Sequence, residues 1–355
     1  MTGMNILLIK QTSLGDVVHA TAVLRSVRLA HPKASITMLT STTAADVFRC
    51  SPDVDRLLTF DRYRIKSDWW RRPLWTLGHF RSTFRAVRDR EFEIALDLQG
   101  SWKTVIFLWA ARANQRCVKG RWWFARRFHQ PQLHAIAEME GVLSLCGIEP
   151  RQHCSILPVI DADRQSMREV LDRFNVANQR VALFCPRTRW PTKNWPLANF
   201  VELVAKLDED FFVIFTGSVE DQQPIAEALM ALPQTRVTSL AGQLSLSEYF
   251  ALVSMADLVL TGDSLPMHVA SAYNRPVVAL FGPTDEARVG PRSDHAVAVR
   301  AVTDCQRCYR RITCPRDCIS QITSEQVSEA INQVLGCGCP SDMSCASTTP
   351  EGGSQ

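Results

Sequence analysis

Residues 262–284 read GDSLPMHVASAYNRPVVALFGPT, and this is the most informative stretch of the chain. Apolar runs at residues 258–260 and 277–281 flank a helical segment, a pattern typical of a strand–loop–helix–strand unit in a parallel sheet. In such a unit the loop exposes backbone N–H groups and the positive end of the helix dipole at the carboxyl edge of the sheet. We therefore expect an anion such as a diphosphate to bind there, next to the polar side chains of Asp263 and His268.

Alternating strands and helices extend from this unit in both directions. Strands are predicted at residues 6–9, 36–39, 57–60, 94–98, 181–184, 212–215, 237–240, 258–260, 277–281 and 297–299. Helices are predicted at residues 14–30, 43–49, 102–113, 133–146, 162–174, 197–207, 222–232, 246–255, 266–273 and 324–335, with an Arg- and Trp-rich helical region ending near residue 90. Two successive sets of alternating elements predict an α/β fold with two Rossmann-like, doubly wound domains that face each other across a cleft.

The boundary between the domains is predicted near residue 160. Residues 1–160 would form the first domain, and residues 161–335 the second. The second domain includes a Cys-rich segment at residues 305–318 and a terminal helix that is expected to return toward the first domain. Residues 336–355 are rich in Gly, Ser, Thr, Pro and Cys, a composition typical of a disordered tail.

The composition is typical of a soluble globular protein, because 46% of the 355 residues are apolar and 21% are charged. The net charge is only +4, but the basic residues are concentrated in two places. Residues 62–90 hold nine Arg or Lys against two acidic residues, and residues 112–129 hold six against none. Such a basic face attracts phosphates, carboxylates, nucleic acid or an anionic membrane.

Targeting signals are not evident in the chain. The first residues carry no basic segment of the kind that opens a signal peptide. The longest apolar run, at residues 105–111, is far shorter than the roughly 20 residues that span a bilayer. We therefore expect a cytoplasmic protein whose contact with a membrane is peripheral. The twelve cysteines are then expected to be thiols or metal ligands, because the cytosol keeps thiols reduced.

The first predicted strand ends in the turn KQTSLGDVVH, at residues 10–19. This turn is neither a Rossmann glycine fingerprint nor a Walker loop, so it gives little support to a nicotinamide enzyme or a nucleoside triphosphatase. Asp16 lies at the start of a helix, at the carboxyl edge of the sheet. A carboxylate in that position can take part in chemistry in the cleft, or it can stabilise the first turn of the helix and do nothing else.

Two further loops of the second domain follow strands at the same edge. Residues 185–196 read CPRTRWPTKNWP, with a pair of hydroxyls and three cations ahead of a helix. Cations there can neutralise a diphosphate leaving group, although a solvated loop with packed tryptophans would look similar. Residues 216–221 read TGSVED, and an acidic residue in this loop can accept hydrogen bonds from ribose hydroxyls or favour the start of a helix.

These loops resemble those of glycosyltransferase family 9, the bacterial heptosyltransferases. The family carries an Asp-Ser/Thr-Gly-x-x-His loop and a Phe-Gly-Pro-Thr end, which residues 263–268 and 281–284 match. The chain departs from this pattern at Leu265, where the family usually has Gly. The family's Trp-x-x-Lys-x-Trp-Pro pattern is matched at residues 190–196, and its Gly-Asp turn at residues 15–16.

The resemblance implies a GT-B architecture in which the first domain holds the acceptor and the second holds a nucleotide-sugar. It implies transfer of L-glycero-D-manno-heptose from ADP-heptose to Kdo-bearing lipid A, by direct displacement with inversion, without a metal or other cofactor and without nucleic acid. The implied catalytic residues are Asp16, as the base, and Lys193, as the partner of the diphosphate. The implied nucleotide-sugar contacts are Thr188, Asp221 (with Glu220 as a substitute), Asp263, Ser264, Leu265 and His268.

Cations and aromatic residues are combined in two segments, residues 62–90 and 121–127. We interpret these segments as an acceptor face for an anionic glycolipid at the cytoplasmic face of the inner membrane, because this part of the family fold meets lipid A. Nucleic-acid binding uses the same residue types, and a solvated helix face with tryptophans in the core would also show them. The candidate acceptor contacts are Arg62, Arg64, Arg121 and Arg126.

Four cysteines are closely spaced near the end of the second domain: Cys305, Cys308, Cys314 and Cys318. Two pairs at such spacings can form a tetrahedral zinc site, and free thiols or disulfides are the alternatives. Two other functions also stay open at this point. One is a sugar-nucleotide epimerase, which shares the two-domain architecture, and the other is a protein that binds anionic lipid or RNA without turnover.

Overall fold

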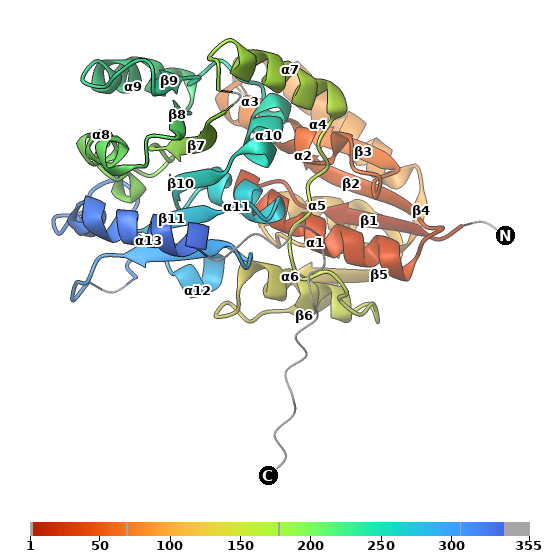
Figure 1. The fold of residues 1–355 in the computed structure, drawn as a ribbon. Coiled ribbons are helices and arrows are strands. Elements are labelled where there is room, and N and C mark those ends of the chain that lie inside the picture. The colour runs from red at the N-terminus through yellow and green to blue at the C-terminus, as the bar shows by residue number, and fades with distance from the viewer. Residues whose placement is uncertain (1–2, 69, 177, 306, 337–355) are drawn as a thin grey trace.

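The chain forms two α/β halves that lie side by side, each built on a parallel sheet of six strands (Figure 1). The structure is a computed structural model and describes residues 3–68, 70–176, 178–305 and 307–336. The predicted α/β class with two doubly wound halves is confirmed. The predicted tail, apart from Gly336, lies outside the described residues. No helix in the described part of the chain is long and apolar enough to cross a bilayer.

The N-terminal half is built on a sheet with the strand order β3-β2-β1-β4-β5-β6. Its strands are β1 (Asn5–Ile9), β2 (Ser35–Ser41), β3 (Arg56–Phe60), β4 (Glu91–Asp97), β5 (Arg112–Lys119) and β6 (Arg126–Phe128). Its helices are α1 (Leu14–Ala30), α2 (Asp46–Arg49), α3 (Arg62–Asp68), α4 (Pro73–Arg88), α5 (Trp102–Ala110) and α6 (Ala135–Ser144), with a 3-10 turn η1 (Thr42–Ala44). The central strands are apolar on both faces, because α1 and α6 cover one face and α4 and α5 the other.

The C-terminal half repeats this plan with the strand order β12-β11-β10-β7-β8-β9. Its strands are β7 (Arg180–Cys185), β8 (Phe211–Phe215), β9 (Val237–Ser239), β10 (Leu258–Gly262), β11 (Val277–Phe281) and β12 (Ala296–Arg300). Its helices are α7 (Asp161–Asp172), α8 (Leu197–Lys206), α9 (Gln222–Leu229), α10 (Leu246–Met255), α11 (Leu265–Ala272), α12 (Glu286–Val289) and α13 (Ser324–Gly336), with 3-10 turns η2 (Pro191–Lys193), η3 (Val219–Asp221) and η4 (Cys318–Gln321). Helices α8, α9 and α13 cover one face of this sheet, and α7, α10 and α11 cover the other.

The strand order reverses direction at β1 in the first sheet and at β7 in the second. Ligands of such sheets bind outside the carboxyl ends of the strands, at this reversal. The two reversals face each other, because α1, which follows β1, packs against α11, which follows β10 (Figure 1). The fold therefore brings the loops of the two halves together.

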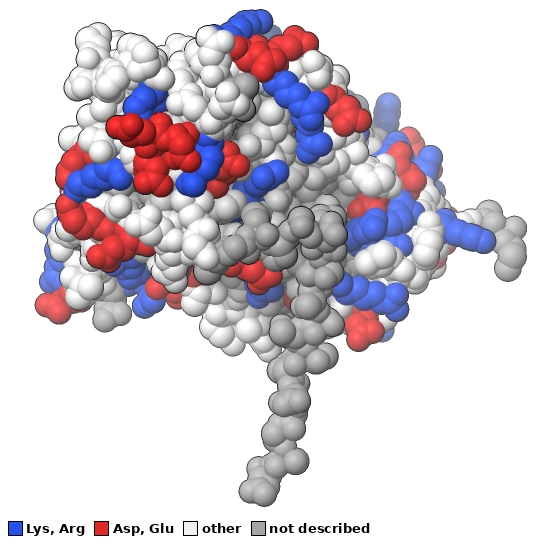
Figure 2. All heavy atoms as spheres, viewed as in Figure 1, with Lys and Arg blue, Asp and Glu red and all other residues white. Residues whose placement is uncertain are grey.

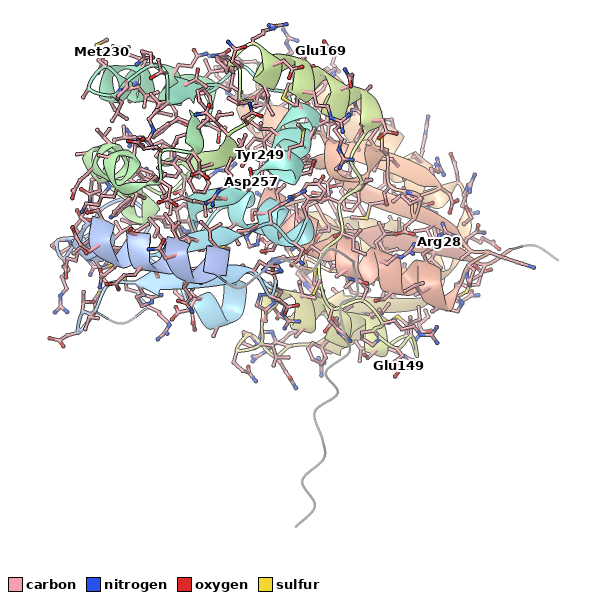
Figure 3. The ribbon with its side chains drawn as sticks, viewed as in Figure 1. Arg28, Glu149, Glu169, Met230, Tyr249 and Asp257 are labelled. Carbon is pink, nitrogen blue, oxygen red and sulfur yellow. A yellow bond between two sulfur atoms is a disulfide. The ribbon has the colours of Figure 1, made fainter. Side chains whose placement is uncertain are left out.

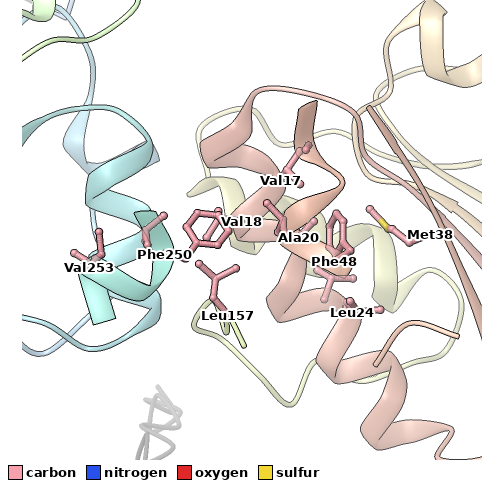
Figure 4. Close-up of a cluster of buried hydrophobic side chains, with 14 of the residues drawn as sticks. Val17, Val18, Ala20, Leu24, Met38, Phe48, Leu157, Phe250 and Val253 are labelled. Carbon is pink, nitrogen blue, oxygen red and sulfur yellow. The ribbon is translucent and has the colours of Figure 1, made fainter. Parts of the chain in front are cut away.

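The two halves share one apolar core. Val18 of α1, Leu157 of the connecting segment and Phe250 of α10 belong to a single cluster of buried side chains that includes strands of both sheets (Figure 4). Apolar surface buried in this way is the main favourable contribution to packing one half on the other. The cluster thus holds the carboxyl edges of the two sheets close to each other.

Two predictions of local structure are wrong. The helix predicted at residues 102–113 ends at Ala110, and residues 112–119 form the strand β5. This strand was not predicted because it is mostly polar and contains no run of apolar residues. The terminal helix α13 packs against β11, β12 and α8 and does not return to the N-terminal half. Its apolar residues Val327, Ile331 and Val334 recur at helical spacing. They pack into the apolar cluster between α8, α9 and the C-terminal sheet, whose strands are nearer in sequence than those of the N-terminal half.

The prediction that the cysteines are thiols or metal ligands fails for one pair. Cys117 of β5 and Cys146, just after α6, form a disulfide with their Cα atoms 6.7 Å apart. The pair meets because α6 packs directly against β5, a contact that the sequence spacing does not reveal. Cys185, by contrast, is buried and forms no disulfide.

Candidate functional site

Loops from both halves converge where α1 meets α11. The turn after β1 carries Asp16, the loop after β7 carries Lys193, and the loop after β10 carries Asp263. All three loops leave the carboxyl ends of parallel strands, as the sequence predicts. The structure therefore provides one region in which side chains of the two halves can act together.

Asp16 lies in the first turn of α1 and is half-buried. Its carboxylate accepts hydrogen bonds from the backbone N–H of Ser13, at 3.1 Å, and from the Ser13 hydroxyl, at 3.0 Å. Burial by itself would raise the pKa of Asp16, but the charges of Lys10 and His19 and the bonds from Ser13 outweigh burial and hold the pKa below its ordinary value. Asp16 is thus a fixed carboxylate that also stabilises the start of its helix.

Lys193 and Asp263 form an ion pair at the start of α11. The Lys193 ammonium lies 2.5 Å from a carboxylate oxygen of Asp263 and donates a longer bond, of 3.3 Å, to the Asp263 carbonyl. The same ammonium lies 4.2 Å from the ring centroid of Trp190, a cation–π contact. Gly262 allows this arrangement, because a Cβ there would lie 2.8 Å from the Lys193 carbonyl oxygen. The loop after β7 and the loop after β10 are therefore in direct contact, and they hold the Lys193 ammonium at the N-terminus of α11.

A histidine of the C-terminal half lies against the turn that carries Asp16. The ring of His268, on α11, is 4.3 Å from the ring of His19, on α1, in an edge-on arrangement. A Cβ at Gly15 would lie 2.4 Å from Cδ2 of His268, so only glycine allows this approach. Burial lowers the pKa of His268, while the charges of Asp263 and then Asp16 act in the opposite direction. His268 thus links the turn of Asp16, which its ring approaches at Gly15, to the helix whose preceding loop carries the Asp263 partner of Lys193.

His19 and His134 surround the same contact, and neither is among the site residues predicted from the sequence. Burial, followed by the charge of His268, holds the pKa of His19 well below its ordinary value. His134 caps α6, and its Nε2 lies 3.1 Å from the carbonyl oxygen of Gly290 in the other half. Since Nδ1 of His134 accepts the N–H of Ile136, the neutral ring donates from Nε2 to Gly290. His19 is three residues after Asp16, so helical spacing could have found it, whereas His134 required the tertiary fold.

Two buried charged residues lie beneath the turn. Lys10 directly follows β1, and burial is the main cause that lowers its pKa, while Asp16 and Asp97 act in the opposite direction. Asp97 ends β4 and accepts hydrogen bonds from the N–H groups of Gln99 and Gly100, at 2.9 and 3.0 Å. Burial raises the pKa of Asp97 to about 6. Its position at the carboxyl end of a predicted strand is the signal that could have identified Asp97 from the sequence.

Ser264 and Leu265 open α11, as the N-cap and first helical residue. The Ser264 hydroxyl lies 3.4 Å from the hydroxyl of Thr261. Leu265 is helical and does not occupy the left-handed region, so the leucine in place of the family's glycine needs no strained backbone. Its side chain packs against the shared core.

The side chains of Thr188 and Asp221 form hydrogen bonds within their own loops. The Thr188 hydroxyl donates to the carbonyl of Trp190, at 2.9 Å, so it shapes the loop that carries Lys193. Asp221 accepts hydrogen bonds from the N–H and hydroxyl of Ser218, both at 2.8 Å, in the arrangement of a capping box. Its other oxygen lies 3.9 Å from Nε of Arg187. The helix-start interpretation of Asp221 therefore fits the geometry.

The four predicted acceptor arginines make different contacts. Arg62 donates to the hydroxyl of Thr12, at 2.8 Å, which brings it to the turn that leads to Asp16. Arg64 lies over the ring of Trp75, and Arg121 is exposed.

Arg126 lies apart from the other three arginines. It donates to the carbonyl of Leu145, at 3.0 Å, at the far end of α6. It also lines a hollow of about 890 Å³ together with Met4, which directly precedes β1, and Glu93, which lies in the first half of β4. Of the four arginines, Arg62 makes a direct contact with the turn that leads to Asp16.

The Cys-rich loop supports the loop that carries Lys193. Cys305, Cys308 and Cys314 line a hollow of about 250 Å³, and burial and the three other thiols raise the pKa of Cys318. Within the described ranges, no group of three or more His, Cys, Asp or Glu is arranged to hold a metal ion. The structure shows a bracing contact, in which the hydroxyl of Thr192 donates to the carbonyl of Arg310, at 2.6 Å.

Comparisons with known proteins agree with this arrangement. The family model of glycosyltransferase family 9 (heptosyltransferase) matches residues 80–319. Lipopolysaccharide heptosyltransferase 2 of Escherichia coli K12 is 24% identical to this chain over 353 residues, which cover 94% of this chain and 99% of that protein.

Two solved structures show the same architecture. The structure of E. coli ADP-heptose LPS heptosyltransferase II is similar with a TM-score of 0.74 and 23% identity, covering 94% of this chain and 98% of that one. A glycosyltransferase family 9 protein of Veillonella parvula has a TM-score of 0.80 and 20% identity, covering 94% of this chain and 97% of that one. The GT-B architecture of two facing Rossmann-like halves is therefore confirmed.

Proposed function

The chain belongs to glycosyltransferase family 9, and on this premise we propose that it transfers L-glycero-D-manno-heptose from ADP-heptose to the inner core of lipopolysaccharide. The relative from E. coli is named as a heptosyltransferase of lipopolysaccharide, and a solved neighbour is named for ADP-heptose. The observation that carries the proposal is the contact between His268 and the Gly15 turn, because it joins the loops of Asp16 and Lys193.

We assign residues 1–160 to the acceptor side and residues 161–335 to the donor side. The packing of α7 on α10 supports this boundary, because α7 is the first helix after residue 160. In the reaction, the acceptor hydroxyl attacks the anomeric carbon of the heptose, and the bond from that carbon to the diphosphate breaks. The product has the inverted configuration, and ADP leaves.

Asp16 would accept the proton of the attacking hydroxyl. The low pKa of Asp16, which Lys10, His19 and Ser13 impose against the effect of burial, makes it a weak base for a neutral alcohol. Proton transfer is therefore expected late, when the hydroxyl has become acidic in the transition state. The same low pKa keeps Asp16 ionised and ready throughout the neutral pH range.

Lys193 and the start of α11 would stabilise the departing diphosphate. Asp263 holds the Lys193 ammonium in place, so one of its three N–H groups is available for a phosphate oxygen. The backbone N–H groups of the first turn of α11 add the positive end of a helix dipole, with the exception of Pro266, which has no N–H. Ser264, Leu265 and His268 would line this pocket, Thr188 would shape it, and Asp221 would accept the ribose hydroxyls.

The acceptor would enter from the side of Arg62. Arg62 already lies at the turn before Asp16, and a guanidinium there suits the acidic sugar of a Kdo-bearing lipid A. Arg64 and Arg121 would extend the cationic path. Because the lipid chains of such an acceptor stay in a bilayer, we infer that the enzyme works at the cytoplasmic face of the inner membrane, through a peripheral contact.

The test is release of ADP from ADP-heptose in the presence of a Kdo-bearing lipid A acceptor. We expect turnover by the wild type and a strong loss in Asp16→Asn. Asp161→Asn is the matched control, because Asp161 is an exposed acid in the first turn of α7. Unchanged turnover in Asp16→Asn would exclude Asp16 as the base.

A thermal-shift panel of ADP-, UDP-, GDP- and CMP-sugars tests the donor independently of turnover, because a bound ligand raises apparent stability. Stabilisation by ADP-heptose without any consumption would favour a binding protein over an enzyme. Stabilisation by another nucleotide-sugar alone would contradict the proposed donor.

A further inference from the structure

Large apolar side chains are exposed at one end of α4 and on the adjacent α5. Trp70 is 63% exposed, Leu74 is 85% exposed and Leu77 is 46% exposed. Trp102, the first residue of α5, is 66% exposed, and α5 packs against α4. Gathered apolar surface of this kind usually marks a site of interaction.

The exposed residues of α4 form a single helix face. Residues 74, 77, 81 and 85 are spaced by three or four positions, so they lie on one side of the helix. Val87, on the opposite side, is buried in the core of the N-terminal half. Arg81 and Arg85 are exposed. The outer face of α4 is therefore apolar at its start and cationic along the next turns, a pattern typical of a helix that lies in a membrane interface.

This face begins beside the acceptor side of the site. The chain reaches α3 and α4 from the carboxyl end of β3, and Arg62, at the start of α3, donates to Thr12 in the turn before Asp16. Trp102 follows the carboxyl end of β4 by a short loop. The apolar start of α4 thus lies at the same sheet edge as the turn that carries Asp16.

The segment that contains α3 and α4 carries an excess of positive charge. Residues 62–90 hold nine Arg or Lys against two acidic residues. By contrast, Figure 2 shows a face that includes α7, α8 and α13, where Lys and Arg are interspersed with Asp and Glu. The α4 segment would therefore be drawn to a negatively charged surface, whereas the face in Figure 2 offers no such preference.

We propose that the surface formed by Trp70, Leu74, Leu77, Arg81 and Arg85, named the α4 surface, docks on an anionic lipid bilayer. The arginines lie among the headgroups, and the leucines and the tryptophan enter the boundary with the acyl chains. Nucleic acid would pair with the arginines but would leave the aliphatic side chains of Leu74 and Leu77 in water, so the bilayer is the better partner. The biological purpose of this docking rests on the proposed function, because it holds the acceptor side of the site close to a membrane glycolipid.

The test is sedimentation of the full chain with vesicles that contain no acceptor. We expect binding to phosphatidylethanolamine–phosphatidylglycerol vesicles that weakens with added salt, and little binding to phosphatidylcholine vesicles. L74S/L77S should lower the partition coefficient by roughly tenfold for each leucine. R81E/R85E should abolish the preference for the anionic vesicles.

Matched controls come from the other half. Met230 directly follows α9 in the C-terminal half and is 79% exposed (Figure 3), so Met230→Ser removes exposed apolar surface from the half that does not carry α4. R168E/R173E reverses two exposed charges at α7. Equal loss of binding in these controls, or no binding of the wild type to anionic vesicles, would overturn the proposal. So would binding to RNA, but not to vesicles, that depends on Arg81 and Arg85.

The result can be separated from the proposed function. Vesicle binding requires no turnover, so an absence of heptose transfer leaves this measurement intact. Conversely, L74S/L77S should keep the turnover of the wild type on a delipidated, water-soluble acceptor. Loss of that turnover would mean that the α4 surface supports the site or the fold itself, which contradicts a purely membrane-docking role.

Discussion

Replacing Gly15 by alanine should separate the two halves of the site without changing a polar group. A Cβ at Gly15 would lie 2.4 Å from Cδ2 and 2.8 Å from Nε2 of His268. Carbon atoms in good contact are about 3.5 to 4.0 Å apart, so α1 and α11 would have to move apart by about 1 Å. His268 has little room to yield, because it is buried and the ring of His19 lies 4.3 Å from its own.

The magnitude follows from the cost of overpacking. One added methyl in a well-packed site costs about 1 to 3 kcal/mol, which corresponds to a loss of about 5- to 150-fold in the closed arrangement. We expect kcat/KM for heptose transfer to fall by a factor in this range. Affinity for ADP, measured by calorimetry, should change much less, since Lys193 and Asp263 stay paired within the C-terminal half.

Two controls isolate the contact. Gly78 is also helical, but a Cβ there meets nothing within 4 Å, so Gly78→Ala gives the gain in helix propensity without the clash. In a His268→Ala background the ring is gone, and Gly15→Ala should then cost almost nothing beyond the loss from His268→Ala itself. If Gly15→Ala costs the same in both backgrounds, or if it keeps full activity, the inference that His268 couples the halves is refuted.

Further predictions concern the leaving group and the interface. Lys193→Met removes the ammonium held at the start of α11 and should lower kcat/KM by about 10²- to 10³-fold in steady-state assays; a loss smaller than about tenfold would exclude a main role in stabilising the diphosphate. Burial, and then Arg292, lowers the pKa of His134 from 6.5 to about 4. The unfolded chain therefore takes up a proton at pH values where folded His134 stays neutral, and stability is lost as the pH falls from 6.5 toward 4. His134→Gln keeps a donor for Gly290 and should flatten this part of the curve of unfolding free energy against pH, as chemical denaturation would measure; parallel curves for variant and wild type would contradict the assignment.

The secondary structure and the location of the site follow from short-range patterns. Apolar runs such as residues 277–281 are long enough to predict buried parallel strands, and the polar loops after them fall at one sheet edge for that reason. This pattern located the loops that carry Asp16, Lys193 and Asp263, whereas the family resemblance selected Asp16 and Lys193 within them. The three loops lie where α1 meets α11. Their roles in the reaction stay predictions.

Strands outside the centre of a sheet are less visible in the sequence. Strand β5 alternates polar residues and contributes Cys117 and Val118 as its buried apolar pair, so no periodicity separates it from the preceding helix α5. The sequence also does not reveal which sheet a helix packs on. The apolar stripe of α13 predicts an amphipathic helix, but a stripe does not specify which of two similar sheets it covers.

The sequence by itself determined that this is a two-part α/β protein and that a polar loop follows β10 at the carboxyl edge of its sheet, because strand period, helix caps and loop composition are local properties of the chain. Only the tertiary structure decided that His268 rests on Gly15, that His134 bonds to Gly290 and that Cys117 meets Cys146. Each of these contacts joins residues far apart in the chain, and its existence depends on the angle and distance at which packed elements meet. Those quantities are set by the shared core between the halves and by the packing of α6 on β5, and no local pattern encodes them.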